Sequence, residues 1–222
     1  MNIDLADIEY LKTKKIMIGV ICINNAITPE SFQSFIKWTE IAKQLNLTFT
    51  TETINCNTSL AMARNQLIAR FMSNNDSTHL LFVDSNIVWE PHHALALMSV
   101  NKHIIGGMYP LPKLPVDLVV TQDPGMATEA HLMEVSKINS GFMLISKEAF
   151  TVLTTHNDIK PYATTNSTIQ PYTYFNEYVA DNGQYVSEEL SFCNKWRSIN
   201  GKLWINTQVQ LGITGPHNFA VN

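Results

Sequence analysis

Apolar runs that predict β-strands recur along the chain. Residues 15–23 (KIMIGVICI) and 79–83 (HLLFV) are almost entirely apolar and rich in branched side chains, which is typical of strands buried on both faces. Residues 47–54 (LTFTTETI) alternate between apolar and polar positions with a period of two, so we expect a third strand there. Residues 102–108 and 137–146 contain further short apolar runs, which predict two more strands.

The segments between these strands have helical spacing. Thr28 followed by Pro29 is a typical helix start, because a threonine hydroxyl can cap the first turn and proline fits the first helical position. Four more helices are predicted, at residues 59–72, 91–100, 147–153 and 187–199. Strands that alternate with helices favour parallel pairing. The sequence therefore predicts an α/β protein with a mostly parallel central sheet flanked by helices.

Two regions lack this regular pattern. Residues 110–124 contain four prolines, so we expect a loop or an excursion at the sheet edge. Residues 154–183 are polar and rich in Asn, Thr and Tyr. A connection of 30 residues is unusually long, and such loops are often lids or binding loops. A short strand at residues 203–206 is expected before a tail that contains glycine and proline.

Composition narrows the class of protein. The chain has 222 residues, with 15 Lys and Arg against 19 Asp and Glu, and a formal charge of −4. This length suits one domain spanning residues 1–222, and an apolar fraction of 45% argues against intrinsic disorder. The acidic balance lacks the positive field with which general nucleic-acid-binding proteins collect phosphates, so no nucleic-acid partner is expected.

Cysteine usage and the apolar runs indicate a location. Cys22, Cys56 and Cys193 are odd in number and widely spaced, so they favour neither a disulfide framework nor a zinc ribbon. A reducing compartment, the cytoplasm, is the simplest expectation. No run approaches the roughly 18 apolar residues needed to cross a bilayer. The first 15 residues also lack the charged-then-apolar order of a secretory signal.

Asp84-Ser85-Asn86 follows directly after the strand predicted at residues 79–83. Ligands of open α/β sheets collect at the carboxyl ends of the strands, so a carboxylate here would face that crevice. If the chain stays extended, Asp84 and Asn86 project to the same side, and their oxygens suit Mg²⁺ or Mn²⁺ with the phosphates that such ions carry. The alternative is an Asx-turn, in which both side chains bond only nearby backbone.

Arg64 lies on or beside the apolar stripe of its predicted helix, four residues after Leu60 and three before Leu67. A buried guanidinium ion without a partner costs several kcal/mol, so it must meet an anion. That anion is either a structural Asp or Glu, or the diphosphate of a ligand, whose shape suits the planar guanidinium group. The sequence leaves both possibilities open.

Acidic residues and a histidine near the C-terminal end are further candidates. Glu188 and Glu189 follow Ser187 in the first turn of a predicted helix, where the helix dipole favours acids in any protein. Because they also follow the long polar loop, one of them is a candidate general base. His217 is either a surface or core histidine, or a ligand that completes the coordination of a metal ion.

Taken in chain order, these motifs resemble those of GT-A glycosyltransferases. The resemblance rests on Asp84-Ser85-Asn86, on residues 139–150 (NSGFMLISKEAF), and on residues 187–193 (SEELSFC), whose helix leads to Asn200-Gly201-Lys202. It covers about residues 15–218. The sequence looks most similar to the compact GT-A domains of large DNA viruses that glycosylate their own capsid.

The resemblance implies a nucleotide-sugar donor, with a UDP-sugar favoured, that lies across the strand ends and carries Mn²⁺ or Mg²⁺ on its diphosphate. Asp84-Ser85-Asn86 would take the place of the family's Asp-x-Asp motif, with the neutral Asn86 a weaker metal ligand than an aspartate. Ala63-Arg64-Asn65 resembles the helix that meets the donor, and Gly141 would let the backbone approach the donor sugar. The implied donor- and cofactor-binding residues are Arg64, Asn65, Asp84, Ser85, Asn86 and Gly141, and the implied metal ligands are Asp84, Asn86 and His217.

The resemblance also implies the chemistry. Glu189 falls where inverting members keep the base that deprotonates the acceptor hydroxyl, and Glu188 is the alternative base. The acceptor would be a glycan or a glycoprotein, in the cytoplasm, or in the host cytoplasm if the protein is viral. Trp89 and Tyr109 are candidates to stack on a sugar ring, with core packing as the alternative for both.

Two other functions stay open at this point. A sugar-nucleotide nucleotidyltransferase shares the layered α/β plan, but residues 23–26 (INNA) lack the glycine-rich, arginine-bearing loop that such enzymes have after the first strand. A non-catalytic nucleotide- or carbohydrate-binding module would explain why Asn86 stands where an acidic ligand is expected. The sequence favours the glycosyltransferase over both.

Overall fold

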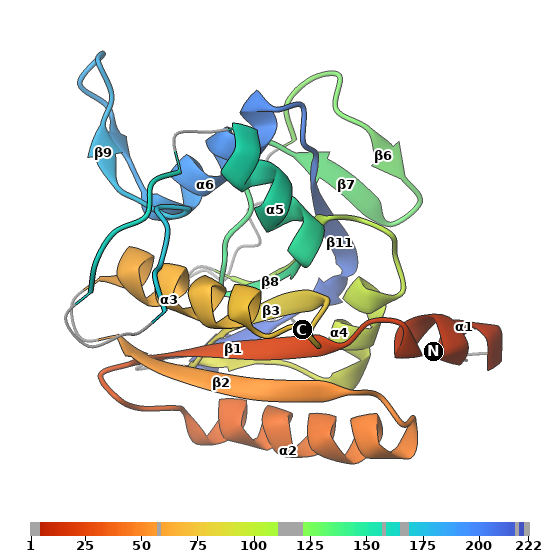
Figure 1. Ribbon diagram of the computed structural model, residues 1–222. Coiled ribbons are helices and arrows are strands. Elements are labelled where there is room, and N and C mark those ends of the chain that lie inside the picture. The colour runs from red at the N-terminus through yellow and green to blue at the C-terminus, as the bar shows by residue number, and fades with distance from the viewer. Residues whose placement is uncertain are drawn as a thin grey trace.

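A central eight-stranded sheet organises the computed structural model, which describes residues 5–56, 59–110, 122–156, 159–164, 169–215 and 218–219 (Figure 1). The strand order is β2-β1-β3-β8-β5-β11-β7-β6. β8 and β7 each run antiparallel to both of their neighbours, and the other six strands all point the same way. The strands are β1 (Ile16–Ile23), β2 (Phe49–Cys56), β3 (His79–Asp84), β5 (Ile104–Met108), β6 (Thr128–Glu129), β7 (Leu132–Val135), β8 (Phe142–Ser146) and β11 (Leu203–Gln210).

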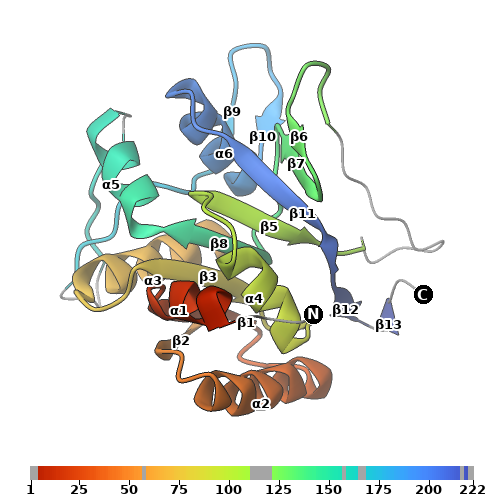
Figure 2. The same cartoon turned by 90° about the vertical axis from the view of Figure 1, so that its right-hand side faces the viewer.

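Helices cover both faces of this sheet, as Figures 1 and 2 show from two sides. Residues of α2 and α4 belong to the apolar layer on one face, and residues of α3, α5 and α6 belong to the layer on the other. The predicted α/β fold with a mostly parallel central sheet flanked by helices is confirmed. The helices are α1 (Leu5–Lys12), α2 (Pro29–Gln44), α3 (Leu60–Ser73), α4 (Pro91–Met98), α5 (Lys147–His156) and α6 (Glu188–Ser198).

Capping side chains set the starts of three helices where the sequence predicts them. The hydroxyl of Thr28 accepts a hydrogen bond from the backbone N–H of Ser31 at the start of α2. Ser59 and Ser187 cap α3 and α6 in the same way. Each cap satisfies a backbone donor that the first helical turn leaves without an intrahelical partner. The polar residue in front of each amphipathic run therefore fixes where that helix begins.

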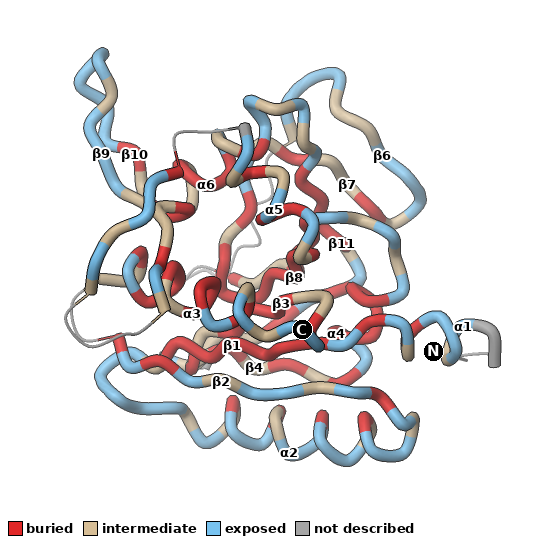
Figure 3. The backbone as a smooth tube through the Cα atoms, viewed as in Figure 1, coloured by how far each residue is buried: buried red, intermediate tan, exposed pale blue. Residues whose placement is uncertain are grey.

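The core consists of two apolar layers, one on each face of the sheet. In β3, Leu80 and Phe82 pack into the layer that contains α3 and α6, while Leu81 and Val83 pack into the layer that contains α2 and α4. This alternation follows from the period of two in a strand. The buried segments in Figure 3 accordingly follow the central strands and the helix faces turned toward them.

Several short elements lie outside the sequence prediction. Most of them are too short to give a period, and β4 and β7 pair with strands far away in the sequence, β12 and β11. β11 extends to Gln210, four residues beyond the predicted end, and most of the proline-rich region at 110–124 lies outside the described residues. In the part of the chain that the structure describes, no helix has the length and apolar character to span a bilayer. The elements that the sequence did not predict are α1, β6, β7, β4 (Ile87–Val88), β9 (Tyr178–Val179), β10 (Tyr185–Val186), β12 (Gly212–Thr214) and β13 (Asn218–Phe219).

Candidate functional site

The strand order reverses between β1 and β3. From β1 the chain crosses through α2 to β2 on one side, whereas β3 pairs with β1 on the other side. Ligands of open α/β sheets bind at such a reversal, outside the carboxyl ends of the strands. Asp84, the last residue of β3, lies there opposite Ile21 of β1. This edge is therefore the place at which the topology favours a ligand site.

The chain turns immediately after Asp84. Ser85 and Asn86 form a turn, so the chain does not stay extended and strand alternation does not align Asp84 with Asn86. The backbone N–H of Ser85 donates to the carbonyl of Ile21, and its carbonyl accepts from the N–H of Thr28. Ser85 is buried, and its backbone ties the end of β1 to the start of α2. These bonds fix the position of Asp84 at the edge.

Arg64 joins Asp84 from the neighbouring helix α3. Its Nη2 lies 3.4 Å from Oδ1 of Asp84, and its Nη1 lies 3.1 Å from Oε1 of Glu188. Nη2 is also 4.0 Å from Oε1 of Glu189. The arginine side chain is only 1% exposed, so the carboxylates offset the cost of burying its charge. Of the two anions that the sequence allowed for Arg64, the fold supplies the first, structural carboxylates.

Glu189 is held mainly by the turn before β8. Its Oε1 accepts hydrogen bonds from the backbone N–H of Ser140 at 2.8 Å and from the Ser140 hydroxyl at 2.6 Å. Among the described residues, no hydrogen bond reaches its other oxygen, Oε2. The side chain is 19% exposed, against 10% for the side chain of Glu188. Glu189 thus combines a fixed orientation with an oxygen that has no hydrogen-bond partner among the described residues, on a side chain that is partly exposed.

The charges of this cluster do not balance. Three carboxylates, those of Asp84, Glu188 and Glu189, surround the single guanidinium ion of Arg64, which leaves a formal charge of −2 if all of them are ionised. Burial raises the pKa of Asp84, and the negative charge of Glu189 raises it further against the opposing effect of Arg64. A largely buried site with this excess of negative charge favours a proton or a cation.

Tyr109, directly after β5, and Gly141, directly before β8, complete the cluster. The Tyr109 hydroxyl accepts a hydrogen bond from the backbone N–H of Gly141 at 3.1 Å. Burial raises the pKa of Tyr109 well above its ordinary value, and the charges of Asp84 and Glu189 raise it further. A Cβ on Gly141 would lie 2.7 Å from the Tyr109 hydroxyl and 2.9 Å from Oδ2 of Asp84. Glycine is therefore required at residue 141 for these two side chains to meet the turn.

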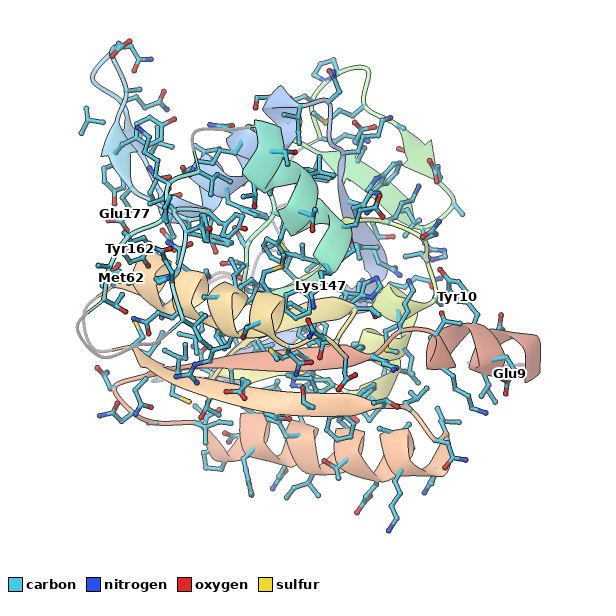
Figure 4. All side chains as sticks on the ribbon, in the orientation of Figure 1. Glu9, Tyr10, Met62, Lys147, Tyr162 and Glu177 are labelled. Carbon is cyan, nitrogen blue, oxygen red and sulfur yellow. The ribbon has the colours of Figure 1, made fainter. Side chains whose placement is uncertain are left out.

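Asn65 lies next to Arg64 on α3, but its side chain bonds the backbone of the long polar loop that follows α5. Its side-chain nitrogen donates to the carbonyl of Phe175 at 2.8 Å, and its side-chain oxygen accepts from the N–H of Phe175 at 2.9 Å. Figure 4 labels Tyr162 and Glu177 of this loop, and Met62 of α3. Both polar atoms of Asn65 are thus used within the fold, and the donor contact that the resemblance implied for it stays a prediction.

The remaining predicted residues lie in different surroundings. Trp89 is 1% exposed and packs against the rings of Trp38 and Phe142, so it belongs to the core and cannot stack on a sugar. The carbonyl of Asn86 accepts from the N–H of Thr214, which brings β12 to the site edge. His217 lies outside the described residues. No group of three metal-binding side chains occurs among the residues that the structure describes.

Sequence reasoning missed the roles of Ser140 and Tyr109 as partners of the acidic residues. Ser140 stands in the Asn139-Ser140-Gly141 segment that carried the resemblance, but no role could be given to it without knowing which strand lies beside it. The available signal was its place directly before a buried strand. Because β8 runs antiparallel to β3, its amino end meets the carboxyl end of β3, and Ser140 therefore lies at the same edge as Asp84.

Comparison with known proteins supports the fold. No family model and no curated protein matches the sequence. The solved crystal structure of A197 from STIV is similar over 94% of both chains, with 12% identity and a TM-score of 0.55. A glycosyltransferase involved in the glycosylation of the major capsid of PBCV-1 matches 61% of this chain and 62% of its own, with 12% identity and a TM-score of 0.33. The first likeness shows a shared fold, and the second is too weak to carry any argument.

Proposed function

We propose that this protein is a glycosyltransferase that moves a sugar from a nucleotide-diphosphate donor to a hydroxyl acceptor. The observation that carries the proposal is the convergence of Asp84, Arg64 and Glu189, from three separate elements, at the edge where the strand order reverses. Carboxylates placed at such an edge can serve both donor binding and proton transfer. A UDP-sugar is our first choice of donor, and a glycan or glycoprotein our first choice of acceptor.

Glu189 is the proposed general base. Sugar transfer with inversion needs a carboxylate within about 3 Å of the attacking hydroxyl. Ser140 holds Oε1 of Glu189, so Oε2 would accept the proton of the acceptor hydroxyl as its oxygen attacks the sugar carbon. The bond from that carbon to the donor diphosphate breaks in the same step. Arg64 then acts as a positioning residue, because it holds Glu188 and Asp84 beside the base.

The donor needs a cation at this edge. The cluster already carries excess negative charge, and the donor diphosphate adds more. Magnesium is commonly bound by one or two carboxylates together with substrate phosphates, so Asp84, with Asn86, would hold Mn²⁺ or Mg²⁺ brought by the donor. Such an ion would offset the charge that develops on the departing diphosphate. Because Asn86 is neutral, we expect the ion to bind weakly unless the nucleotide is present.

Calorimetric titration with a panel of nucleoside diphosphates tests donor binding. We expect UDP to bind in the presence of Mn²⁺ and to bind at least about tenfold more weakly without it, a difference of about 1.4 kcal/mol. In an Asp84→Asn protein, Mn²⁺ should hardly increase the affinity for UDP. If no nucleotide binds with or without Mn²⁺, the proposal is refuted.

Turnover of a bound donor tests the base. Glu189→Gln keeps the shape of the side chain but removes the basic oxygen, so transfer to an acceptor should fall by about 100- to 10,000-fold while nucleotide binding persists. Glu177→Gln is the matched control, because Glu177 is an exposed acid on the preceding loop and should leave turnover unchanged. Undiminished turnover in Glu189→Gln would mean that Glu188 is the general base or that the mechanism has none.

A non-catalytic nucleotide-binding module is the second candidate. The observation in its favour is that the hydrogen bonds of Arg64 all go to carboxylates of the protein, so the cluster has a structural use without any substrate. The two functions differ in one measurement. A module would bind the nucleotide, yet it would release no sugar from any donor, with or without an acceptor.

A further inference from the structure

The hydroxyl group of Tyr109 carries a proton that no described residue accepts. Its oxygen accepts a hydrogen bond from the backbone N–H of Gly141 at 3.1 Å, and this is its one hydrogen bond in the part of the chain that the structure describes. The side chains of Arg64 and Ser140, by contrast, donate to carboxylates of the acidic cluster. The proton of Tyr109 is therefore available to a ligand.

The fold directs this hydroxyl group toward the acidic cluster. The ring of Tyr109 packs against the apolar layer that contains α2 and α4, so the hydroxyl end, and not the ring, meets the cluster. Burial raises the pKa of Tyr109 well above its ordinary value, and the charges of Asp84 and Glu189 raise it further, so the hydroxyl keeps its proton. The same negative charges attract that proton, which orients the O–H bond toward the carboxylates.

Asp84 presents an unused acceptor beside this donor. Its Oδ1 bonds Arg64, whereas no hydrogen bond from a described residue reaches its Oδ2. A Cβ on Gly141 would lie 2.7 Å from the Tyr109 hydroxyl oxygen and 2.9 Å from Oδ2 of Asp84, so both oxygens lie over the same side of Gly141. Their separation is therefore within what two hydrogen bonds through one ligand oxygen can span.

We infer that Tyr109 and Asp84 together hold a ring hydroxyl of the donor sugar, which accepts from Tyr109 and donates to Oδ2 of Asp84. The inference rests on the proposed function and assigns the sugar end of the donor to this pair. A hydroxyl group both donates and accepts, so it satisfies the two residues at once. A phosphate oxygen only accepts, and its charge would be repelled by the carboxylate. A carboxylate has about four lone-pair sites, so this bond leaves room for a cation on Asp84.

Tyr109→Phe tests the inference with UDP alone and with UDP-glucose, UDP-galactose and UDP-N-acetylglucosamine, turnover being measured as release of UDP. We expect kcat/KM for the preferred UDP-hexose to fall about tenfold or more, because the sugar hydroxyl loses one of its two partners. The affinity for UDP with Mn²⁺ should change by less than about twofold. Tyr174→Phe is the matched control: it removes a buried tyrosine hydroxyl that bonds Thr154 at 2.7 Å, and it should leave both quantities unchanged.

Monodeoxy analogues of the preferred donor separate direct contact from an indirect effect. One analogue should lose as much kcat/KM with the wild type as Tyr109→Phe loses with the complete donor, and combining that analogue with the variant should cost little more. Losses that simply add for every analogue would overturn the inference. Equal losses of affinity for UDP and for the UDP-hexose would also overturn it, because they would assign Tyr109 to the diphosphate.

The same measurements distinguish failure of the inference from failure of the proposed function. If the wild type binds no nucleotide, the proposed function fails, and the inference fails with it. If the wild type turns over a UDP-hexose and Tyr109→Phe is equally active, only the inference is overturned.

Discussion

Helix α3 carries two arginines in opposite environments. Arg64 is 1% exposed and lies among the carboxylates of Asp84, Glu188 and Glu189. Arg70, less than two turns further along, is 45% exposed and pairs with Glu52 of β2. The two guanidinium groups have the same chemistry and similar shortest distances to a carboxylate oxygen, 3.1 Å for Arg64 and 3.0 Å for Arg70. The comparison therefore sets a buried arginine among three carboxylates against an exposed arginine beside one carboxylate and the carbonyl of Thr53.

Burial changes what an ion pair does. An exposed pair contributes about 0–1 kcal/mol, because water solvates both ions when the pair separates. A buried pair contributes little net stability compared with apolar residues, yet removal of one partner leaves an unpaired charge that costs far more. The Arg64 cluster is thus a poor way to stabilise a fold. Its position where the strand order reverses favours a role in binding or catalysis instead.

Loss of Arg64 should have the largest effect on stability. Arg64→Met leaves three carboxylates facing one another without a cation, and we expect the free energy of unfolding to fall by about 3–5 kcal/mol. Urea denaturation followed by circular dichroism measures this change. Arg64→Lys should recover only part of the loss, because an ammonium group cannot contact Asp84 and Glu188 in the way that the planar fork does. A loss below about 1 kcal/mol in Arg64→Met would show that the cluster is protonated or hydrated.

Loss of one carboxylate should cost less. Glu188→Gln keeps a hydrogen-bond acceptor for Arg64 but removes the charge of its closest partner, at 3.1 Å. We expect the free energy of unfolding to fall by about 1–3 kcal/mol, the range for a buried bond to a charged group. Glu52→Gln, which removes the partner of Arg70, is the control. Equal changes in the two variants would mean that burial does not distinguish the pairs.

The sequence predicts the half of the molecule in which local patterns decide structure. The strands β1 and β3 and the helices α2 and α3 have long apolar runs or caps, and Thr28 and Ser59 begin the helices where they are expected to. The resemblance placed Asp84, Arg64 and Glu189 in one site, and the fold brings them together. The strands and helices follow from periodicity, and the position of Asp84 follows from where its strand ends, whereas the place of Glu189 beside it was implied only by the resemblance.

The sequence does not predict very short strands or contacts between distant residues. β4 has two residues, which is too few for a period, and it pairs with β12, more than 120 residues further along the chain. The anion of Arg64 stayed open, because the choice between a protein carboxylate and a ligand depends on how α6 packs against α3. Likewise, that Asn65 would bond the backbone of Phe175, 110 residues away, has no local signal.

The charge of Asp84 should have a smaller effect on stability, and one that depends on pH. Burial raises the pKa of Asp84 in the folded protein, so ionisation of this carboxyl group destabilises the fold. Its contribution to stability is complete below its unfolded pKa and is lost as the pH rises through its folded pKa. Asp84→Asn removes this dependence. We therefore expect the melting temperature of the variant minus that of the wild type to increase between about pH 4 and pH 8. A difference that decreases over this range would show that Arg64 outweighs burial.

The exposed arginine should give the smallest effect. Arg70→Gln removes the pair with Glu52 but leaves both sites open to water, so we expect the free energy of unfolding to change by less than about 1 kcal/mol. The change should shrink further in about 0.5 M salt, because ions screen exposed charges. Urea denaturation at low and high salt measures both changes. A loss above about 1 kcal/mol would show that the Arg70–Glu52 pair does not behave as an exposed pair.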